Sequence, residues 1–228
     1  MAYGRVNTGT GTVPSTPAGP AARLYHCDTI SDNIYELDPD TLLPINTVSS
    51  PSTVPYGVGG TVTRLYHCDN SSDSLYELDL DTLLSINTIS SPSSYPAGVG
   101  GTATRLYHCD IDSDSLYELD LDTLLPINTV ASPSTSPYGV GGTATRLYHC
   151  DTSSDKIYEL DLDTLLPINT ISSPNSYPAG VGGTATRLYH CDPSSDSLYR
   201  LDPDTLLSIN TISSPSTSPY GVGGTKET

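Results

Sequence analysis

The sequence contains no tryptophan and no phenylalanine, and it has only one methionine. Any hydrophobic core must therefore be built from leucine, isoleucine, valine and tyrosine. Basic residues are also scarce, with 9 Lys and Arg against 26 Asp and Glu, which gives a formal net charge of −17. Because contact with a phosphate backbone requires a basic patch, this charge argues against nucleic acids as partners. It also argues against anionic membrane surfaces and favours cationic partners.

Long hydrophobic runs are missing as well. The opening segment, MAYGRVNTGTGTVPSTPAGPAA, has no apolar stretch long enough for a signal peptide, and no part of the chain approaches the length of a membrane span. We therefore expect synthesis in the cytosol and no insertion into a membrane. Apolar residues also show no helical periodicity over any long segment, which predicts an all-β chain.

The sequence is dominated by a repeat that begins with the hexapeptide RLYHCD. The five copies start, 41 residues apart, at Arg23, Arg64, Arg105, Arg146 and Arg187. Such a period is typical of solenoids, propellers and other arrays. The second unit has strand patterns at residues 56–60, 64–68, 75–78 and 86–90, separated by Asp, Ser and Pro breaks. We therefore predict a five-bladed β-propeller built from five near-identical 41-residue four-stranded repeats, with a β-solenoid as the structural alternative.

The order of motifs PYGV, RLY, IYELDPDT and INTI resembles the blades of the YVTN and NHL-like propeller families, over nearly the whole array from residue 23 to residue 224. The likeness rests on the Pro-Gly start of the innermost strand, the Leu-Tyr of the second strand and the Tyr-x-x-Asp of the third. The resemblance implies a propeller fold. It does not imply one activity, because these families include binding proteins, scaffolds and a few enzymes.

Paired glycines end each predicted innermost strand, where five chains converge on the channel and only glycine permits close approach. Two segments compete for the innermost place in the first blade: residues 220–224, which keep the glycines, and residues 17–22, a degraded copy. We favour residues 220–224, which would close the ring by pairing with residues 23–48 and so remove exposed strand edges. The predicted organisation is an N-terminal docking or assembly arm, 1–22, followed by the propeller, 23–228.

All five cysteines and all five histidines lie in the RLYHCD copies. A ring separates equivalent cysteines by roughly 12 Å, which is too far for a disulfide. His26 and Cys27 are adjacent on a strand and so point to opposite faces, which argues against a shared metal ion. We expect Cys27 to be a buried apolar filler and His26 to pack between blades, with Glu36 as a candidate cross-strand partner. Arg200 replaces this glutamate in the fifth unit.

Aspartates recur at the breaks between strands, as in Asp69, Asp73, Asp79 and Asp81 of the second unit. We interpret them as turn residues whose carboxylates accept hydrogen bonds from backbone amides. A calcium site at Asp69 and Asp73, or at Asp79 and Asp81, is the alternative, but each loop offers fewer oxygens than calcium requires. We predict no metal site and no cofactor.

An active site is not expected. A catalytic triad needs unlike residues that converge from different parts of the chain, whereas nearly every candidate catalytic residue here is repeated with rotational symmetry. A metal-dependent propeller hydrolase or lactonase is the enzymatic alternative. The sequence predicts instead a non-enzymatic structural or adhesive display module.

Differences between the repeats gather in two loops, after the second strand and before the innermost strand, which we expect on one face. Each unit places one tyrosine there: Tyr56, Tyr95, Tyr138, Tyr177 and Tyr220. Tyrosine beside Ser, Thr and Asp suits weak binding of a glycan or protein ligand, and five weak sites combine by avidity. Drift of long loops is the simpler explanation of the differences, and a packing role for the tyrosines is an equal alternative to binding.

The N-terminal residues MAYGRVN and the Gly/Thr stretch after them resemble the start of small phage-tail-associated proteins. This resemblance implies a virion appendage whose arm, residues 1–22, contacts a virion partner or further copies of the chain. The expected location is then the virion or a cell surface after cytosolic synthesis. An intracellular protein-interaction scaffold is the alternative function.

Overall fold

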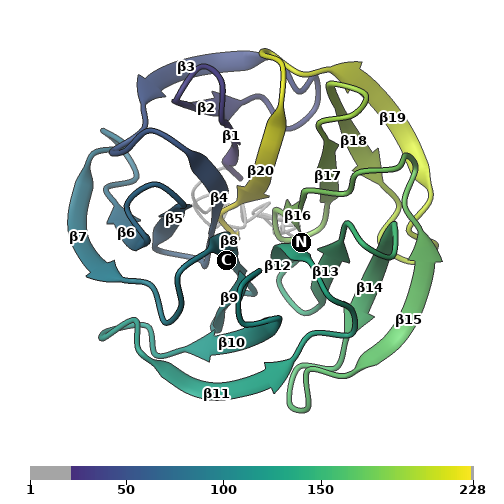
Figure 1. Cartoon of the computed structure of the whole chain (residues 1–228). Helices are drawn as coiled ribbons and strands as arrows, with labels where there is room; N and C mark the ends of the chain where they lie inside the picture. Colours follow the sequence, from purple (N-terminus) through teal and green to yellow (C-terminus); the bar gives the residue numbers. More distant parts are fainter. Residues whose placement is uncertain (1–21, 227–228) are drawn as a thin grey trace, which may run out of the picture.

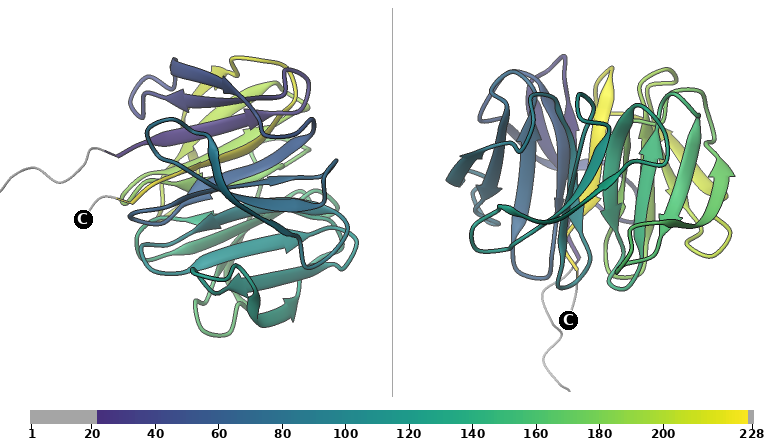
Figure 2. Two further views of the ribbon diagram at one scale, coloured as in Figure 1. Left: turned by 90° about the vertical axis from the view of Figure 1, so that its left-hand side faces the viewer. Right: turned by 60° about the horizontal axis from the view of Figure 1, so that its bottom comes forward.

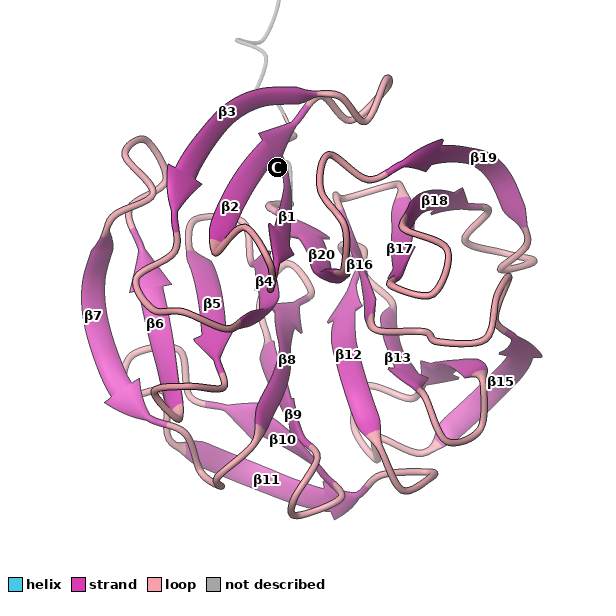
Figure 3. Cartoon of the chain, turned by 45° about the horizontal axis from the view of Figure 1, so that its top comes forward, coloured by secondary structure: helices cyan, strands magenta, loops and turns pink. Residues whose placement is uncertain are grey.

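The computed structural model describes residues 22–226, which form a β-propeller of five four-stranded antiparallel sheets arranged around a central axis (Figure 1). The predicted fold class is confirmed: there are five blades, and each corresponds to a repeat of about 41 residues. Strands are joined by turns and loops only, and the described residues contain no helix that could span a membrane (Figure 3).

In each blade the strands follow one another from the channel to the circumference. The innermost strands are β20 (Pro219–Gly224), β4 (Pro55–Gly60), β8 (Pro96–Gly101), β12 (Pro137–Gly142) and β16 (Gly180–Gly183). The second strands are β1 (Leu24–Asp28), β5 (Leu65–Asp69), β9 (Leu106–Asp110), β13 (Leu147–Asp151) and β17 (Leu188–Asp192). The third strands are β2 (Asn33–Leu37), β6 (Ser74–Leu78), β10 (Ser115–Leu119), β14 (Lys156–Leu160) and β18 (Ser197–Leu201). The outer strands are β3 (Pro44–Ser49), β7 (Ser85–Ser90), β11 (Pro126–Ala131), β15 (Pro167–Ser172) and β19 (Ser208–Ser213).

The hydrophobic core lies between successive blades, which pack face to face around the axis (Figure 2). Between the first two blades, Tyr25, Cys27 and Ile34 of one contact Leu65 and Tyr76 of the other. Because the second strand has a blade on each side, it is buried on both faces, and its sequence is a short run rather than an alternating pattern. All five cysteines are buried and free, as predicted, and burial raises the pKa of each thiol well above its usual range.

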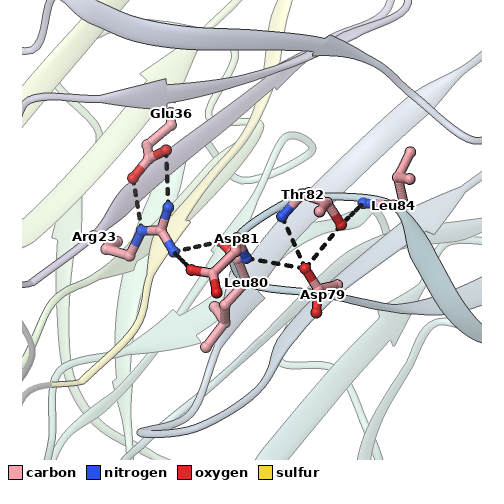
Figure 4. Close-up of polar contacts among 7 residues, drawn as sticks. All are labelled: Arg23, Glu36, Asp79, Leu80, Asp81, Thr82 and Leu84. Atoms are coloured by element: carbon pink, nitrogen blue, oxygen red, sulfur yellow. Dashed lines mark hydrogen bonds and ion pairs between the residues drawn. The ribbon is translucent and has the colours of Figure 1, made fainter.

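The turns between third and outer strands are held by the predicted aspartate chemistry. Asp79 accepts hydrogen bonds from the backbone N–H of Asp81 (3.2 Å) and of Thr82 (2.8 Å), and from the Thr82 hydroxyl (2.8 Å) (Figure 4). Leu83 then adopts a left-handed conformation (φ 58°) although it is not glycine. Its side chain is almost completely buried, so packing compensates the unfavourable backbone angle.

An arginine at the start of each RLYHCD motif joins its blade to the next. Arg23 donates to both carboxylate oxygens of Glu36 in its own blade (2.7 and 3.1 Å) and to the Leu80 carbonyl of the following blade, where it also approaches Asp81 (3.5 Å; Figure 4). The other four arginines pair with an aspartate of the next blade at 2.7–2.8 Å: Arg64–Asp122, Arg105–Asp163, Arg146–Asp204 and Arg187–Asp40. The last pair links the fifth blade to the first.

The ring is completed by β20, which pairs antiparallel with β1, so that Leu24 lies opposite Gly224 and His26 opposite Val222. The first blade therefore takes its innermost strand from the far end of the chain. The predicted arm, residues 1–22, lies outside the described residues except for Ala22.

The proposed pairing of His26 with Glu36 is wrong. In the ladder His26 lies opposite Tyr35, and Tyr25 lies opposite Glu36, so the two side chains are one residue out of step. Successive strand residues point to opposite faces, which places His26 and Glu36 on different sides of the sheet.

Candidate binding face

The innermost strands come so close together that side chains are excluded at their glycines. A Cβ added to Gly98 would lie 2.8 Å from both the Tyr138 carbonyl oxygen and the Val140 nitrogen of the next blade. A Cβ on Gly141 would lie 2.8 Å from the Val181 carbonyl oxygen. These contacts explain the GVGG sequence and leave little free space along the axis.

The central channel is accordingly almost filled. The void at its tyrosine-bearing mouth has a volume of about 10 Å³ and is bordered by the valines and glycines of the innermost strands. A single water needs about this much space. A ligand larger than water would therefore have to bind on a face of the propeller and not within the channel.

The five tyrosines predicted as ligand-binding residues converge at that mouth. The rings of Tyr56, Tyr138 and Tyr220 lie 4.6–6.0 Å apart, centroid to centroid. Tyr95 lies 5.8 Å from Tyr56, and Tyr177 lies 5.5 Å from Tyr138. We call the surface formed by these five residues the tyrosine face.

Hydroxyl contacts tie the outer two tyrosines to the inner three. The oxygens of Tyr95 and Tyr56 lie 3.2 Å apart, and the Tyr177 hydroxyl donates to that of Tyr138 at 2.9 Å. Burial raises the pKa of Tyr56, Tyr138 and Tyr220 well above the usual tyrosine value, so these hydroxyls stay protonated at physiological pH. These three residues thus contribute neutral aromatic rings and hydroxyl groups to the cluster.

The alternation between PYGV and PAGV in the sequence has a steric reason. Tyr56, Tyr138 and Tyr220 occupy one position of the innermost strand, and in the other two blades that position holds Ala97 and Ala179, both fully buried. Three rings already fill the centre, so the remaining two blades carry their tyrosine two residues earlier, farther from the axis.

The aspartate of each RLYHCD motif helps to position this face. Asp110 accepts a hydrogen bond from the backbone N–H of Tyr95 (3.0 Å), and Asp192 accepts one from Tyr177 (2.9 Å). In the second blade Asp69 binds the N–H of Val54 (3.0 Å) and the hydroxyl of Ser71 (2.7 Å). These bonds hold the two variable loops side by side on one face, as predicted.

The buried histidines also hold these loops in place, through hydrogen bonds to the innermost strand and to the segment that crosses from the preceding blade. His26 donates from Nδ1 to the Gly221 carbonyl of the innermost strand (2.8 Å), and its Nε2 accepts from the Ser214 hydroxyl (3.2 Å) in the segment that crosses from the fifth blade. Each of the other four histidines makes the same two contacts, with a glycine carbonyl and a serine 17 residues earlier. Burial lowers the pKa of all five to about 4, so they are neutral at pH 7. These serines were not predicted from the sequence, although the fixed spacing between serine and histidine is visible in the repeat.

No three His, Cys, Asp or Glu side chains converge as a metal site within residues 22–226. Both carboxylate oxygens of Asp69 and one of Asp79, the candidate calcium ligands, accept hydrogen bonds from nearby backbone and side-chain groups.

The two faces of the propeller therefore carry different side chains. One side gathers tyrosine rings and hydroxyls, and the other gathers the arginine–aspartate pairs of the turns. The tyrosine face offers aromatic rings and hydroxyl groups. Such a surface is suited to binding through stacking and hydrogen bonds.

Comparison with known proteins finds no matching family model and no matching curated protein. Membership of the YVTN or NHL-like families, and the phage-tail resemblance, therefore stay predictions. Among solved structures the chain is similar to a chain of a nidogen/laminin complex, with 15% identity, a TM-score of 0.61, and coverage of 90% of this chain and 98% of that one. It is also similar to streptogramin B lyase (17% identity, TM-score 0.54, 88% and 69% covered) and to a protein of unknown function from Bacteroides caccae (9% identity, TM-score 0.59, 89% and 98% covered). At these identities the likeness shows the propeller fold alone.

Proposed function

We propose that the chain is a non-enzymatic display module that binds a glycan or a protein ligand through its tyrosine face. The observation that carries this proposal is the convergence of Tyr56, Tyr95, Tyr138, Tyr177 and Tyr220 at one mouth of a filled channel. Four of these tyrosines, Tyr95, Tyr138, Tyr177 and Tyr220, are partly exposed, and tyrosine rings and hydroxyls can stack on a sugar ring or a peptide and donate hydrogen bonds. The similar propeller in the nidogen/laminin complex belongs to a protein–protein complex, which supports a protein ligand.

The proposal extends to location and assembly. We infer a virion or surface appendage that is made in the cytosol and assembles through residues 1–22. A chain lacking these residues should remain folded, because every described strand lies after them, but should lose assembly with its partner or with further copies. Normal assembly of the truncated chain would remove the arm from the proposal.

A glycan array tests the tyrosine face directly. We expect the full chain to bind a subset of glycans, and a Tyr95→Ala/Tyr177→Ala variant to bind them at least about tenfold more weakly. Ile86→Ser, a substitution of an exposed residue on the circumference, is the matched control and should bind like the parent chain. Equal binding by the tyrosine variant would contradict the assigned face.

The alternatives give different results in the same set of experiments. An array with no bound glycan would favour the intracellular protein-interaction scaffold. A purified protein that carries one divalent metal ion per chain would favour the metal-dependent hydrolase or lactonase.

A further inference from the structure

The circumference of the propeller carries an exposed aliphatic pair on every blade. Each pair consists of a leucine at the end of the turn and an isoleucine two residues later on the outer strand, with 56–65% of each residue exposed. We call these ten residues the rim pairs: Leu43 and Ile45, Leu84 and Ile86, Leu125 and Ile127, Leu166 and Ile168, Leu207 and Ile209. Within residues 22–226 the only other large hydrophobic residue of such exposure is Ile30.

In each rim pair the leucine lies just before the outer strand, and the isoleucine is the second residue of that strand, at a β-bulge in its pairing with the third strand. Each also borders an open edge. The outer strands β3, β7, β11, β15 and β19 are the last in their sheets, and they run around the outside of the molecule (Figure 1). An edge strand offers unpaired N–H and C=O groups to another extended segment.

Protection of these edges is incomplete. Natural proteins commonly blunt an edge with lysine or proline. In this chain β3, β11 and β15 begin with proline, whereas β7 and β19 begin with Ser85 and Ser208. None of the five outer strands contains a lysine or any other charged residue. The edges of the second and fifth blades are therefore the least protected.

Acidic side chains border the rim pairs. Beside Ile168 lies a groove of about 300 Å³ that is also lined by Leu162, Glu159, Asp161 and Asp163. The groove contains three carboxylates and a single guanidinium, that of Arg146. A lysine or arginine side chain fits this combination, because its aliphatic stem can cover the isoleucine while its charged end reaches a carboxylate.

Charge decides between candidate occupants of the rim. Two copies of a chain with a net charge of −17 repel one another, which disfavours pairing of rim against rim. Five of the few basic side chains, Arg23, Arg64, Arg105, Arg146 and Arg187, are already engaged in ion pairs between blades. The fitting partner is thus basic as well as aliphatic.

We propose that the rim of the propeller binds an extended segment of a partner protein in which aliphatic side chains alternate with lysine or arginine. The segment adds to an outer strand as a fifth strand, its aliphatic side chains cover a rim pair, and its basic side chains face the neighbouring carboxylates. Because every blade has such an edge, and those of the second and fifth blades are the least protected, several segments of one partner can bind together, which increases avidity. This surface is separate from the tyrosine face, so an experiment can contradict the binding role of one surface without affecting that of the other.

The probe is a short synthetic peptide in which isoleucine and lysine alternate, labelled at one end and measured by fluorescence anisotropy with the full chain. We expect saturable binding that weakens as salt is raised, because ion pairs contribute. A peptide of the same composition with its isoleucines and lysines in two blocks is the matched probe control. It has the same charge but cannot present alternate faces, so it should bind at least about tenfold more weakly.

The protein variant replaces Ile45, Ile86, Ile127, Ile168 and Ile209 by serine. These residues are exposed, so the fold should persist, and circular dichroism would verify it. Affinity for the alternating peptide should fall at least about tenfold, whereas Ile30→Ser, in the loop between β1 and β2 and away from the outer strands, should leave it unchanged.

Two results would overturn the proposal. Equal binding of the block peptide, or unchanged binding by the serine variant, would show only attraction of a basic peptide to an acidic protein. A full chain that sediments as a dimer, and becomes a monomer in the serine variant, would show that the rim is occupied by a second copy.

Discussion

At the scale of single residues, the near-identity of the blades allows equivalent residues to be compared in slightly different surroundings. Tyr189 donates from its hydroxyl to the Pro39 carbonyl of the next blade at 2.8 Å. The equivalent Tyr107 is equally buried, but its hydroxyl has no hydrogen-bond partner among the described residues. The two environments differ in the turn they face, which contains proline in one case and leucine in the other.

We predict that Tyr189→Phe lowers the free energy of unfolding by about 1 kcal/mol, because it removes a buried hydrogen bond. Tyr107→Phe should leave stability unchanged or raise it slightly, because the lost hydroxyl is buried without a partner. Urea unfolding of the two variants and the parent measures both effects. Equal losses in the two variants would contradict this account.

The buried histidines predict a specific dependence of stability on pH. Their pKa is about 4 in the folded chain and about 6.5 in an unfolded one, so between these values the unfolded state binds more protons. Stability should therefore fall as pH drops from about 6.5 toward 4, by about 1.4 kcal/mol per pH unit for each titrating histidine.

Urea unfolding at a series of pH values measures this slope, and His67→Gln should reduce it by the share of one histidine. The turn aspartates provide an internal check. Hydrogen bonds from the turn threonines lower the pKa of Asp38, Asp79, Asp120, Asp161 and Asp202 below the usual value, so their contribution is lost only at still lower pH. A flat profile between pH 4.5 and 6.5 would contradict the neutral, buried state of the histidines.

At the scale of elements, the arginine that starts each second strand has an acidic partner on the third strand in four blades. The pairs are Arg23–Glu36, Arg64–Glu77, Arg105–Glu118 and Arg146–Glu159, at 2.7–3.7 Å. In the fifth blade Arg200 takes the place of glutamate, and its Nε atom is buried without a hydrogen-bond partner within residues 22–226. This blade therefore combines a lost ion pair with an unsatisfied donor.

We predict that Arg200→Glu raises the free energy of unfolding by about 1 kcal/mol, because it removes the unsatisfied donor and supplies Arg187 with the missing carboxylate. Arg200→Gln is the matched control, since it removes the charge without supplying a new one, and its gain should be smaller. Thermal or urea unfolding measures both. A less stable glutamate variant would show that Arg200 has a favourable role of its own.

At the scale of the whole molecule, the ring has a seam where the two ends of the array meet. In four blades an amide before the innermost strand donates to the aspartate of the RLYHCD motif, as Ser136 does to Asp151 at 3.1 Å. At the seam Ser218 donates to Asp196 instead, at 2.9 Å, and adopts a left-handed conformation with φ 65°. One oxygen of Asp28 is then left without a partner among the described residues.

We predict that Ser218→Gly stabilises the chain by about 1 kcal/mol, because glycine adopts a positive φ without steric cost. Ser136→Gly, at the equivalent position with an ordinary backbone angle, should instead destabilise it by about 0.5–1 kcal/mol through the greater freedom of the unfolded chain. Opposite signs for the two variants, measured by urea unfolding, support strain at the seam. The same sign would contradict it.

The propeller itself could be predicted because its cause is local and repeated five times. Strand patterns, Asp-x-Asp-Thr turns and paired glycines each follow from short-range chemistry, and all recur in the structure. The convergence of the tyrosines could not be derived in the same way. It depends on how closely five innermost strands approach, and hence on contacts such as Gly98 against Val140 that join separate repeats. The arginine links and the rim pairs were missed because each depends on the neighbouring blade or on the free edge of a sheet.

The distribution of tyrosine and alanine at the channel mouth has one further consequence. Large and small side chains could alternate without interruption only around an even number of blades. With five blades, two adjacent blades must carry side chains of the same size at this position. These are the first and the second blade, where the ring centroids of Tyr220 and Tyr56 lie 4.6 Å apart. A ligand bound at the mouth would contact two adjacent tyrosines on one side and a mixture of tyrosine and alanine on the other. A nearly fivefold-symmetric propeller can therefore bind an asymmetric ligand in a single orientation.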